Sequence, residues 1–282
     1  MRRLFCCLFL AAALWAQQTT EFICPMDRDV RSPTPGKCPR CGMTLVANLP
    51  EPSDYPVYLR VNPPQIPSAR PITLEFRIAD PANGAPVTHF EIVHEKLFHL
   101  FIVSQDLEYF AHLHPQFDGA VFKLDTTLPK PGAYRLLADF YPAGGTPQLV
   151  PKTITTAGYT VSLDAAIPRL ASDLSPKHGE NLEASLKLDP PEPIAGKKTM
   201  LFVHLTPADG LEPYIGAWAH LLAVSDDLVD TIHEHPFIAH GGPDMQFNIF
   251  FPREAVYRVW IQLQRKGVVN TVAFTIPVTS LK

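Results

Sequence analysis

Short apolar runs, broken at regular intervals by turn residues, make up most of the chain. Leu74, Phe76 and Ile78 alternate with polar neighbours, which is the period of a strand with one buried face. The run 97–103 is apolar on both faces, as expected for a strand in the middle of a sandwich. Pro-Gly, Asn-Gly and Asp-Gly pairs separate such runs, and no stretch keeps a helical period. The pattern therefore predicts a mainly β protein built from β-sandwiches of the immunoglobulin or cupredoxin sort.

The same succession of runs occurs twice along the chain. Four blocks recur in one order and at nearly one spacing, namely 59–64 with 186–191, 72–78 with 199–205, 99–115 with 220–236, and 133–140 with 256–263. Such self-similarity indicates a tandem duplication of a unit that is long enough to bury its own core. We therefore expect a first sandwich at 51–163, a linker at 164–180 and a second sandwich at 181–282.

Composition supports folded β domains and excludes one class of partner. Of the 282 residues, 46% are hydrophobic and 18% are charged, as in ordinary globular proteins. The 30 prolines are an unusually high number and disfavour helix interiors. The net charge of −4 provides no basic surface, so nucleic acid is not expected as a partner.

The first residues have the pattern of a cleavable signal peptide. Arg2 and Arg3 precede an apolar run over 4–16, which ends in Ala-Leu-Trp-Ala and is too short to span a bilayer. We expect a signal peptide at 1–16 with cleavage after Ala16, and therefore a periplasmic or secreted mature protein. No later stretch has the length and apolarity of a transmembrane segment.

Cleavage would leave three cysteines, all within the segment 17–50. This segment concentrates three thiols and two thioethers, which belong to Cys24, Cys38, Cys41, Met26 and Met43. Two cysteines separated by two residues can place both sulfurs on one metal ion. A Cys38–Cys41 disulfide is the alternative, although an odd number of cysteines fits a disulfide framework poorly. The segment holds little apolar surface to bury, so we expect it to need metal in order to fold.

The block that matches best between the two repeats carries three histidines in each copy. Their spacing is identical in the two copies, which hold His99, His112 and His114 and, in the second, His220, His233 and His235. The last two of each set lie two residues apart, so on a strand they point to one face. If the hairpin loop before them has an even number of residues, the first histidine shares that face and three imidazoles converge. Such a set suits Cu(II), Zn(II) or Ni(II); the alternative is that the histidines only cap strand ends.

Four further residues with potential donor atoms flank the triplets. His240 and Met245 follow the second triplet, and the thioether of Met245 is a soft donor suited to Cu(I). His89 and His94 precede the first triplet, and we interpret them as loop residues.

The cysteine segment resembles a known metal-binding domain. Cys24-Pro-Met-Asp27 followed by Pro35-Gly-Lys-Cys38-Pro-Arg-Cys41-Gly-Met43 is similar to the heavy-metal-binding domain at the N-termini of copper-transporting P-type ATPases and metal-efflux adaptors. The resemblance implies a small zinc-ribbon-like knuckle in which the three cysteines are ligands and the two methionines are soft auxiliary ligands. Those domains usually have histidine where this chain has Asp27. A carboxylate suits Zn(II) better than Cu(I), and Asp27 is either a fourth ligand or a bystander.

These features predict an exported metal-binding protein for the binding, trafficking or resistance of copper or zinc, similar to exported bacterial β-sandwich proteins that carry this knuckle. The alternative is an interaction module of the cell envelope, with an efflux component as partner and histidines that are not ligands. A cupredoxin-like oxidoreductase is a third interpretation, but the Cys-His-Met ligand run of an electron-transfer copper site is missing. Motifs for a Ser or Cys nucleophile, a phosphate-binding loop or His-Glu-x-x-His are also missing, so we expect no enzymatic activity.

Overall fold

The computed structural model describes residues 21–47, 52–162 and 164–281. The predicted signal peptide at 1–16 lies outside these residues. Within them the chain forms nineteen β-strands and one short 3-10 helix, η1 (Asp164–Ala166), which confirms the expected mainly β class. In this part of the chain no helix is long and apolar enough to cross a membrane.

The N-terminal segment folds as a knuckle of turns around one short hairpin. Strands β1 (Phe22–Ile23) and β2 (Arg31–Ser32) pair antiparallel. A tight turn closes the Cys-x-x-Cys stretch, because the Gly42 N–H donates to the Cys38 carbonyl and the Cys38 N–H donates to the Met43 carbonyl, at 2.9 and 2.7 Å. Gly42 has a φ of 77°, a conformation that favours glycine.

The first repeat is a sandwich of two antiparallel sheets. One sheet has the order β3-β4-β8-β7 and consists of Val57–Asn62, Pro71–Ile78, Phe122–Thr127 and Gln116–Phe117. The other has the order β10-β9-β5-β6 and consists of Gln148–Thr155, Ala133–Phe140, Phe98–Ser104 and Phe110–Leu113. The predicted alternation along β4 is confirmed, since Leu74, Phe76 and Ile78 are buried and the residues between them are not.

The second repeat has the same architecture. Its outer sheet has the order β11-β12-β13-β17 and consists of Lys177–His178, Glu183–Asp189, Lys198–Thr206 and Asp244–Phe250. Its inner sheet has the order β14-β18-β15-β16, with β19 also paired to β18, and consists of Leu211–Glu212, Ala255–Arg265, His220–Ser225, Thr231–Glu234 and Val268–Val278.

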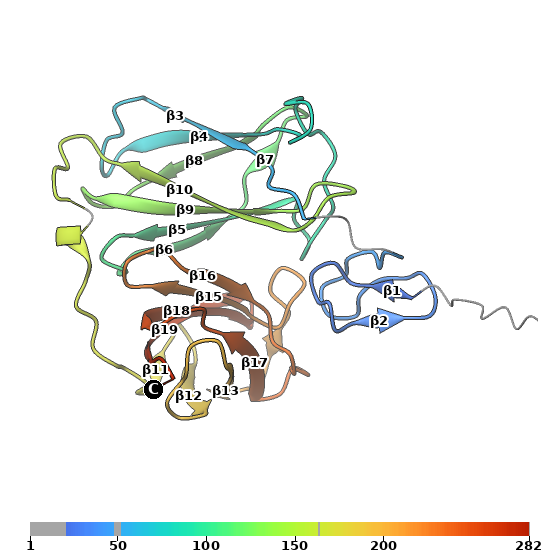
Figure 1. The fold of residues 1–282 in the computed structure, drawn as a ribbon. Helices are drawn as coiled ribbons and strands as arrows, with labels where there is room; N and C mark the ends of the chain where they lie inside the picture. The colour runs from blue at the N-terminus through green and yellow to red at the C-terminus, as the bar shows by residue number, and fades with distance from the viewer. Residues whose placement is uncertain (1–20, 48–51, 163, 282) are drawn as a thin grey trace, which may run out of the picture.

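The two sandwiches pack against each other through the sheets that contain β5 and β15 (Figure 1). A separate apolar core lies between them and includes Phe101, Val103, Leu222, Val224 and Trp260. The Phe110 and Trp260 rings stack across this interface with their centroids 5.2 Å apart. Strand β5 is buried along its whole length, as the sequence predicts. One of its faces packs in the core of its own sandwich, and the other face is covered by the second repeat.

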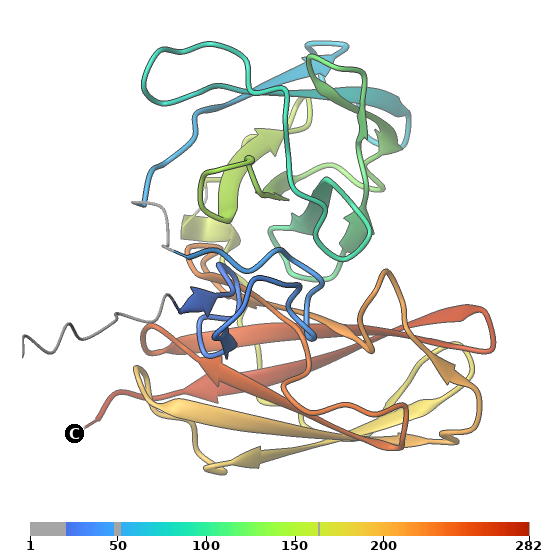
Figure 2. The same cartoon turned by 90° about the vertical axis from the view of Figure 1, so that its right-hand side faces the viewer.

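The knuckle lies beside this interface and touches both sandwiches (Figure 2). Its cysteines and Met43 form one apolar cluster with Val93 and Tyr141 of the first repeat. The Arg40 guanidinium lies over the Phe237 ring of the second repeat, 4.9 Å from the ring centroid. The first repeat therefore completes the small core of the knuckle, which the sequence of the segment alone does not indicate.

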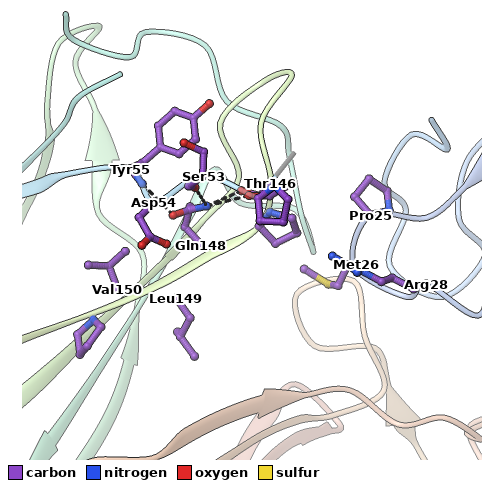
Figure 3. A pocket seen from close by; sticks show the side chains of 13 residues that line it. Pro25, Met26, Arg28, Ser53, Asp54, Tyr55, Thr146, Gln148, Leu149 and Val150 are labelled. Atoms are coloured by element: carbon purple, nitrogen blue, oxygen red, sulfur yellow. Dashed lines mark hydrogen bonds between the residues drawn. The ribbon is translucent and has the colours of Figure 1, made fainter. Parts of the chain in front are cut away.

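A cavity of about 650 Å³ separates another part of the knuckle from the first sandwich (Figure 3). Met26 and Arg28 line it on the knuckle side, and Tyr55, Thr146 and Gln148 line it on the sandwich side. The knuckle thus packs against the first repeat around Val93 and Tyr141, and this opening lies between the knuckle and the edge near β10.

Candidate metal centres

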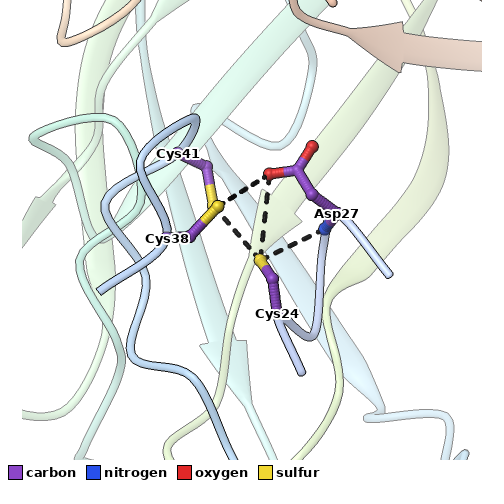
Figure 4. A group of neighbouring side chains, drawn as sticks. All are labelled: Cys24, Asp27, Cys38 and Cys41. Atoms are coloured by element: carbon purple, nitrogen blue, oxygen red, sulfur yellow. Dashed lines mark hydrogen bonds between the residues drawn. The ribbon is translucent and has the colours of Figure 1, made fainter. Parts of the chain in front are cut away.

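Three cysteines and one aspartate meet in the knuckle (Figure 4). One ligand atom each of Cys24, Asp27, Cys38 and Cys41 lies within 4.8 Å of all the others. The sulfurs of Cys24 and Cys41 are 3.5 Å apart, and the Cys38 thiol lies 3.3 Å from Asp27 Oδ2. All three cysteines are free thiols, so the structure does not contain the alternative Cys38–Cys41 disulfide.

Asp27 is oriented so that one carboxylate oxygen faces the sulfurs. Its Oδ1 accepts a hydrogen bond from Arg40 at 2.9 Å, while Oδ2 faces the thiols of Cys24 and Cys38. Burial raises the pKa of Asp27, whereas hydrogen bonds from Cys41 and Arg40 oppose that rise. The position at which the related domains have histidine therefore supplies an oxygen donor, and three sulfurs with one oxygen can form a tetrahedral zinc site.

Contacts among the three thiols shift their pKa values in different directions. Hydrogen bonds from the thiols of Cys24 and Cys41 lower the pKa of Cys38. The contact with Cys38 raises the pKa of Cys24 to about 11, and contacts with the other two thiols raise the pKa of Cys41. Since the thiolate is the form that binds metal, a cation at this place would displace the remaining protons. This donor set suits Zn(II) or Cu(I).

The two knuckle methionines have different surroundings. Met43 is 1% exposed and packs in the apolar cluster that contains the three cysteines and Tyr141. Met26 is half-buried and lines the 650 Å³ cavity. Packing alone accounts for Met43, and Met26 faces an open space at the edge of the knuckle (Figure 3).

The histidines of the first repeat converge as the strand register requires. In the β5–β6 hairpin Phe101 pairs with His112, and the same register places His99 opposite His114. The loop 105–108 between the paired residues has an even number of residues. The first histidine therefore shares a strand face with the other two, as convergence requires. The ligand atoms of the three histidines lie within 4.8 Å of one another, and small side-chain shifts would bring them to the spacing of about 3.3 Å that one tetrahedral metal ion requires.

The second repeat reproduces this arrangement. Leu222 pairs with His233 in the β15–β16 hairpin, which places His220 opposite His235 across the loop 226–229. The ligand atoms of this triplet also lie within 4.8 Å of one another. The identical spacing in sequence therefore corresponds to the same geometry in both repeats.

The two triplets face each other across the interface of the sandwiches. The ring centroids of His112 and His220 are 5.2 Å apart, and those of His99 and His233 are 6.2 Å apart. Within a triplet the centroids are separated by 4.7 to 5.9 Å. The six rings thus form one cluster, and it exists only because the two repeats dock.

Hydrogen bonds to backbone carbonyls fix the protonated nitrogen of the first histidine in each triplet. Nε2 of His99 and Nε2 of His220 each donate to a carbonyl of the preceding turn, at 3.0 and 2.9 Å. Because a carbonyl oxygen only accepts, Nδ1 of each neutral ring carries a lone pair. These lone pairs face His112 Nε2 at 2.9 Å and His235 Nε2 at 3.0 Å.

The middle histidine of each triplet is held by the other repeat. His112 Nδ1 donates to Gln262 Oε1 at 3.1 Å, and His233 Nδ1 donates to Asp139 Oδ2 at 2.5 Å. Asp139 and Gln262 occupy the same position in β9 and β18, since each pairs with the first histidine of its own repeat. The interface therefore has an approximate twofold relation in which each repeat orients a ring of the other.

These contacts leave nitrogens without protons directed into the cluster. Nε2 of His233 is unprotonated when Nδ1 donates to Asp139, and it is buried without a hydrogen-bond partner, as is Nε2 of His114. Nδ1 of His99 and Nε2 of His112 face each other as two lone pairs, an arrangement that a cation between them would stabilise. Ligand nitrogens on one tetrahedral zinc ion are about 3.3 Å apart, close to these contacts. The residues therefore fit Zn(II) or Cu(II), with outer partners of the kind that metal-binding histidines use.

Burial favours the neutral form of these rings. Desolvation lowers the pKa of His94 and of His114 to about 3. Desolvation also lowers the pKa of the remaining buried rings for which a shift is resolved, His99, His112, His220 and His235, and neighbouring histidines reinforce the effect for the last three. Neutral imidazole is the form that binds metal, so the folded site needs little proton displacement at neutral pH.

One histidine that the sequence places in a loop is part of the cluster. His94 is 3% exposed, and its ring centroid is 3.7 Å from that of His235 and 5.4 Å from that of His220. His94 lies in a turn, as expected, but the second repeat covers the turn at 93–96, so the ring is buried beside the second triplet. The equivalent position in that repeat holds Ile215. Because the histidine is not repeated, matching the two copies does not mark His94 as a member of the cluster.

The other flanking candidates lie outside the cluster. His89 and His240 are exposed, and Met245 is 2% exposed within the core of the second sandwich. Tyr214, by contrast, has its ring centroid 5.8 Å from that of His220 and forms part of the wall of the cluster.

The strand that carries His233 also carries a carboxyl group of shifted pKa, that of Glu234. It follows His233 in β16, so its side chain points to the opposite face of the strand. Burial raises the pKa of Glu234 to about 7, and the carboxylates of Asp27 and Asp29 add to the rise.

Comparison with known families agrees with this division of the chain. The heavy metal binding domain matches residues 22–48, which supports the N-terminal resemblance. A second family, described as a domain of unknown function (DUF8832), matches residues 51–158 and 177–280, and the chain belongs to this family. No curated protein matches the chain.

Solved structures resemble the chain only in general architecture. A two-domain fibronectin type III segment of chicken tenascin shares 14% identity over 79% of this chain and 99% of that chain, with a TM-score of 0.23. Fibronectin(III)-like modules of Clostridium thermocellum CbhA share 10% identity over 79% and 95%, with a TM-score of 0.22. The Yersinia pseudotuberculosis adhesin InvE shares 12% identity over 78% and 58%, with a TM-score of 0.24. At these scores the resemblance carries no functional argument.

Proposed function

We propose that the protein binds copper or zinc outside the cytoplasm and transfers it between the knuckle and the histidine cluster. The observation that carries the proposal is the convergence of unprotonated, buried nitrogens in two triplets beside a cluster of free thiols. Thiolates suit Cu(I) and Zn(II), and imidazoles suit Zn(II) and Cu(II), so these two elements satisfy both kinds of site. The predicted signal peptide supports export, and the proposed role is in metal trafficking or resistance.

A cavity between the knuckle and the second repeat supports transfer. A cavity of about 440 Å³ is lined by Pro39 and Arg40 of the knuckle and by Trp218 and His235 of the second repeat. His235 is a member of the second triplet, and Arg40 binds the carboxylate of Asp27 in the cysteine group. A cation released from the thiols would therefore enter the histidine cluster at its second triplet. The role is binding and transfer rather than catalysis, with a metal-efflux or other envelope protein as the partner.

Metal analysis of the full mature chain tests this proposal. We expect three equivalents of Zn(II) per chain, of which one is lost in Cys38→Ser/Cys41→Ser. We expect the double variant His99→Ala/His220→Ala to lose the other two, because it removes one ligand from each triplet. The exposed histidines His178 and His204 provide the matched control, and their double replacement by Ala leaves the stoichiometry unchanged.

The same measurement separates this function from the interaction module. If His99→Ala/His220→Ala binds as much zinc as the wild type, the histidines are not ligands and the envelope interaction module is favoured. N-terminal sequencing of protein from the periplasm or medium tests export, for which we expect a first residue of Gln17. A sequence that begins at Met1 would contradict it.

A further inference from the structure

His94 is presented by a tight turn that both repeats share. Val93 and Lys96 exchange backbone hydrogen bonds of 2.9 and 3.0 Å, and His94 has a φ of 46°. The second repeat forms the same turn between Tyr214 and Ala217, where Ile215 has a φ of 50°. The backbone is therefore equivalent, but one repeat carries an imidazole at this position and the other carries an aliphatic side chain.

The His94 side chain reaches across the interface into the second repeat. The turn at 93–96 packs on the turn at 214–217, and a Cβ atom at Gly216 would lie 3.4 Å from the Cα atom of His94. His94 is 3% exposed, and neither ring nitrogen makes a hydrogen bond of regular geometry. Burying a polar ring in this way is unfavourable unless a ligand engages it.

His94 lies at the ring separation of a co-ligand from His220 but stacks against the ring of His235, and it is outside the group of three histidines whose ligand atoms lie within 4.8 Å of one another. Two imidazoles on one tetrahedral zinc ion have their ring centres about 5 Å apart, given metal–nitrogen bonds of about 2.0–2.1 Å. The His94 and His220 centroids are 5.4 Å apart, within the range found inside the triplets. The His94 and His235 rings, at 3.7 Å, would have to separate by about 1–2 Å when a cation enters between them.

We propose that His94 is the fourth nitrogen ligand of the metal site formed by His220, His233 and His235. The inference deepens the proposed metal-binding function and rests on it. The second site then has four imidazoles, three from its own repeat and one from the first repeat. The first site has three imidazoles and keeps a coordination position for water or an incoming ligand.

The two sites therefore differ in kind. A closed four-ligand site retains its cation, whereas a three-ligand site exchanges it more readily. The outer partners reinforce the difference, because the carboxylate of Asp139 supports the second triplet and the neutral amide of Gln262 supports the first. The second site is the tight one, and the first is the open one.

Competition of zinc-loaded full-length protein with a chelator of known affinity tests the inference. The variant His94→Ile carries the residue that the second repeat uses, and His240→Ala is the matched control because His240 is exposed and lines the same cavity as His235. We expect wild-type protein to hold two histidine-bound zinc ions of unequal affinity. We expect His94→Ile to weaken the tighter one by at least about tenfold and to leave the weaker one and the knuckle unchanged. His240→Ala has no effect on any of the three.

Thermal unfolding of the metal-free proteins excludes a purely structural explanation. If His94 serves as a ligand, metal-free His94→Ile is at least as stable as wild type, because an unsatisfied ring is replaced by an aliphatic side chain. A loss of stability in the metal-free variant, or two unchanged zinc affinities, would overturn the role of His94 and leave the proposed function intact. Wild-type protein with no histidine-bound zinc would instead overturn the proposed function and this inference together.

Discussion

The cysteine group and the histidine cluster are built on different principles. The cysteine group takes all four donors from residues 24–41, and backbone hydrogen bonds of one turn hold Cys38 and Cys41 in place. The histidine cluster takes its rings from two hairpins that are more than 100 residues apart, and each repeat supplies an outer partner to the other. A local motif thus defines a soft-metal site, whereas the nitrogen site depends on the docking of two domains.

The largest expected difference between the two regions appears when metal is removed and the pH is lowered. Six histidines of the cluster have folded-state pKa values below the ordinary 6.5, namely His94 and His114, at about 3, and His99, His112, His220 and His235. At these rings the unfolded chain therefore binds more protons, so their contribution to stability is complete above about pH 6.5 and is lost as the pH falls towards 3. Each such group contributes up to about 1.4 kcal/mol per pH unit in that window.

Denaturant unfolding of chelator-treated protein at pH 7.5, 6.5 and 5.5 measures this effect. We expect a steep loss of the free energy of unfolding below pH 6.5, and a smaller loss in zinc-loaded protein because protons must compete with the metal. The knuckle segment contains no histidine and does not contribute to this titration. Stability of the metal-free protein that is constant over this range would contradict a cluster of buried neutral imidazoles.

Trp260→Ala should separate the two regions by opening the domain interface. The Trp260 ring is 3% exposed and stacks on Phe110. Its removal should lower the free energy of unfolding by about 3–5 kcal/mol. We expect zinc binding by the histidines to be lost or strongly weakened, while the cysteine group keeps its ion.

Metal stoichiometry combined with denaturant unfolding checks this prediction. Phe202→Ala is the control, because Phe202 is 37% exposed on the outer sheet of the second sandwich and makes no contribution to the interface core. Histidine sites that survive Trp260→Ala with unchanged affinity would show that each hairpin binds metal without the other repeat.

Asp139→Asn should weaken the second triplet alone. The substitution removes the charge that supports His233 and keeps the size of the side chain. Loss of such an outer partner typically lowers metal affinity about 10–100-fold. The reciprocal change Gln262→Glu places a carboxylate beside His112, and we expect it to strengthen the first triplet. Zinc titration of both variants measures the two effects, and equal changes at both triplets would contradict the reciprocal arrangement.

Met43→Leu should have the smallest effect. Met43 is 1% exposed in the apolar cluster of the knuckle, and leucine has a similar volume. The change should cost less than about 1.5 kcal/mol. We expect the affinity of the cysteine group for Cu(I) to be unchanged, as measured by competition with a Cu(I) chelator. A large loss of Cu(I) affinity without loss of stability would instead identify the thioether as a ligand.

Much of this architecture follows from the sequence. The alternation along β4, the duplication and the spacing of the histidines are all local patterns, and local patterns fix which face of a strand a residue occupies. The spacing of the histidines made convergence depend on the parity of the hairpin loop, and the structure supplies the even loops 105–108 and 226–229 that bring each triplet together. The Cys-x-x-Cys spacing likewise identified the knuckle, because its turn is closed by neighbouring residues.

The sequence alone did not determine what surrounds the histidines. The sequence places His94 in a loop but does not show that the second repeat buries its ring. It also makes Met245 a possible soft ligand, whereas the structure places this side chain in the core of the second sandwich. The roles of Asp139 and Gln262 depend on contacts across more than 90 residues of chain. Only the tertiary structure decided these points, because side chains from distant strands become neighbours when two apolar sheet faces pack together and exclude water.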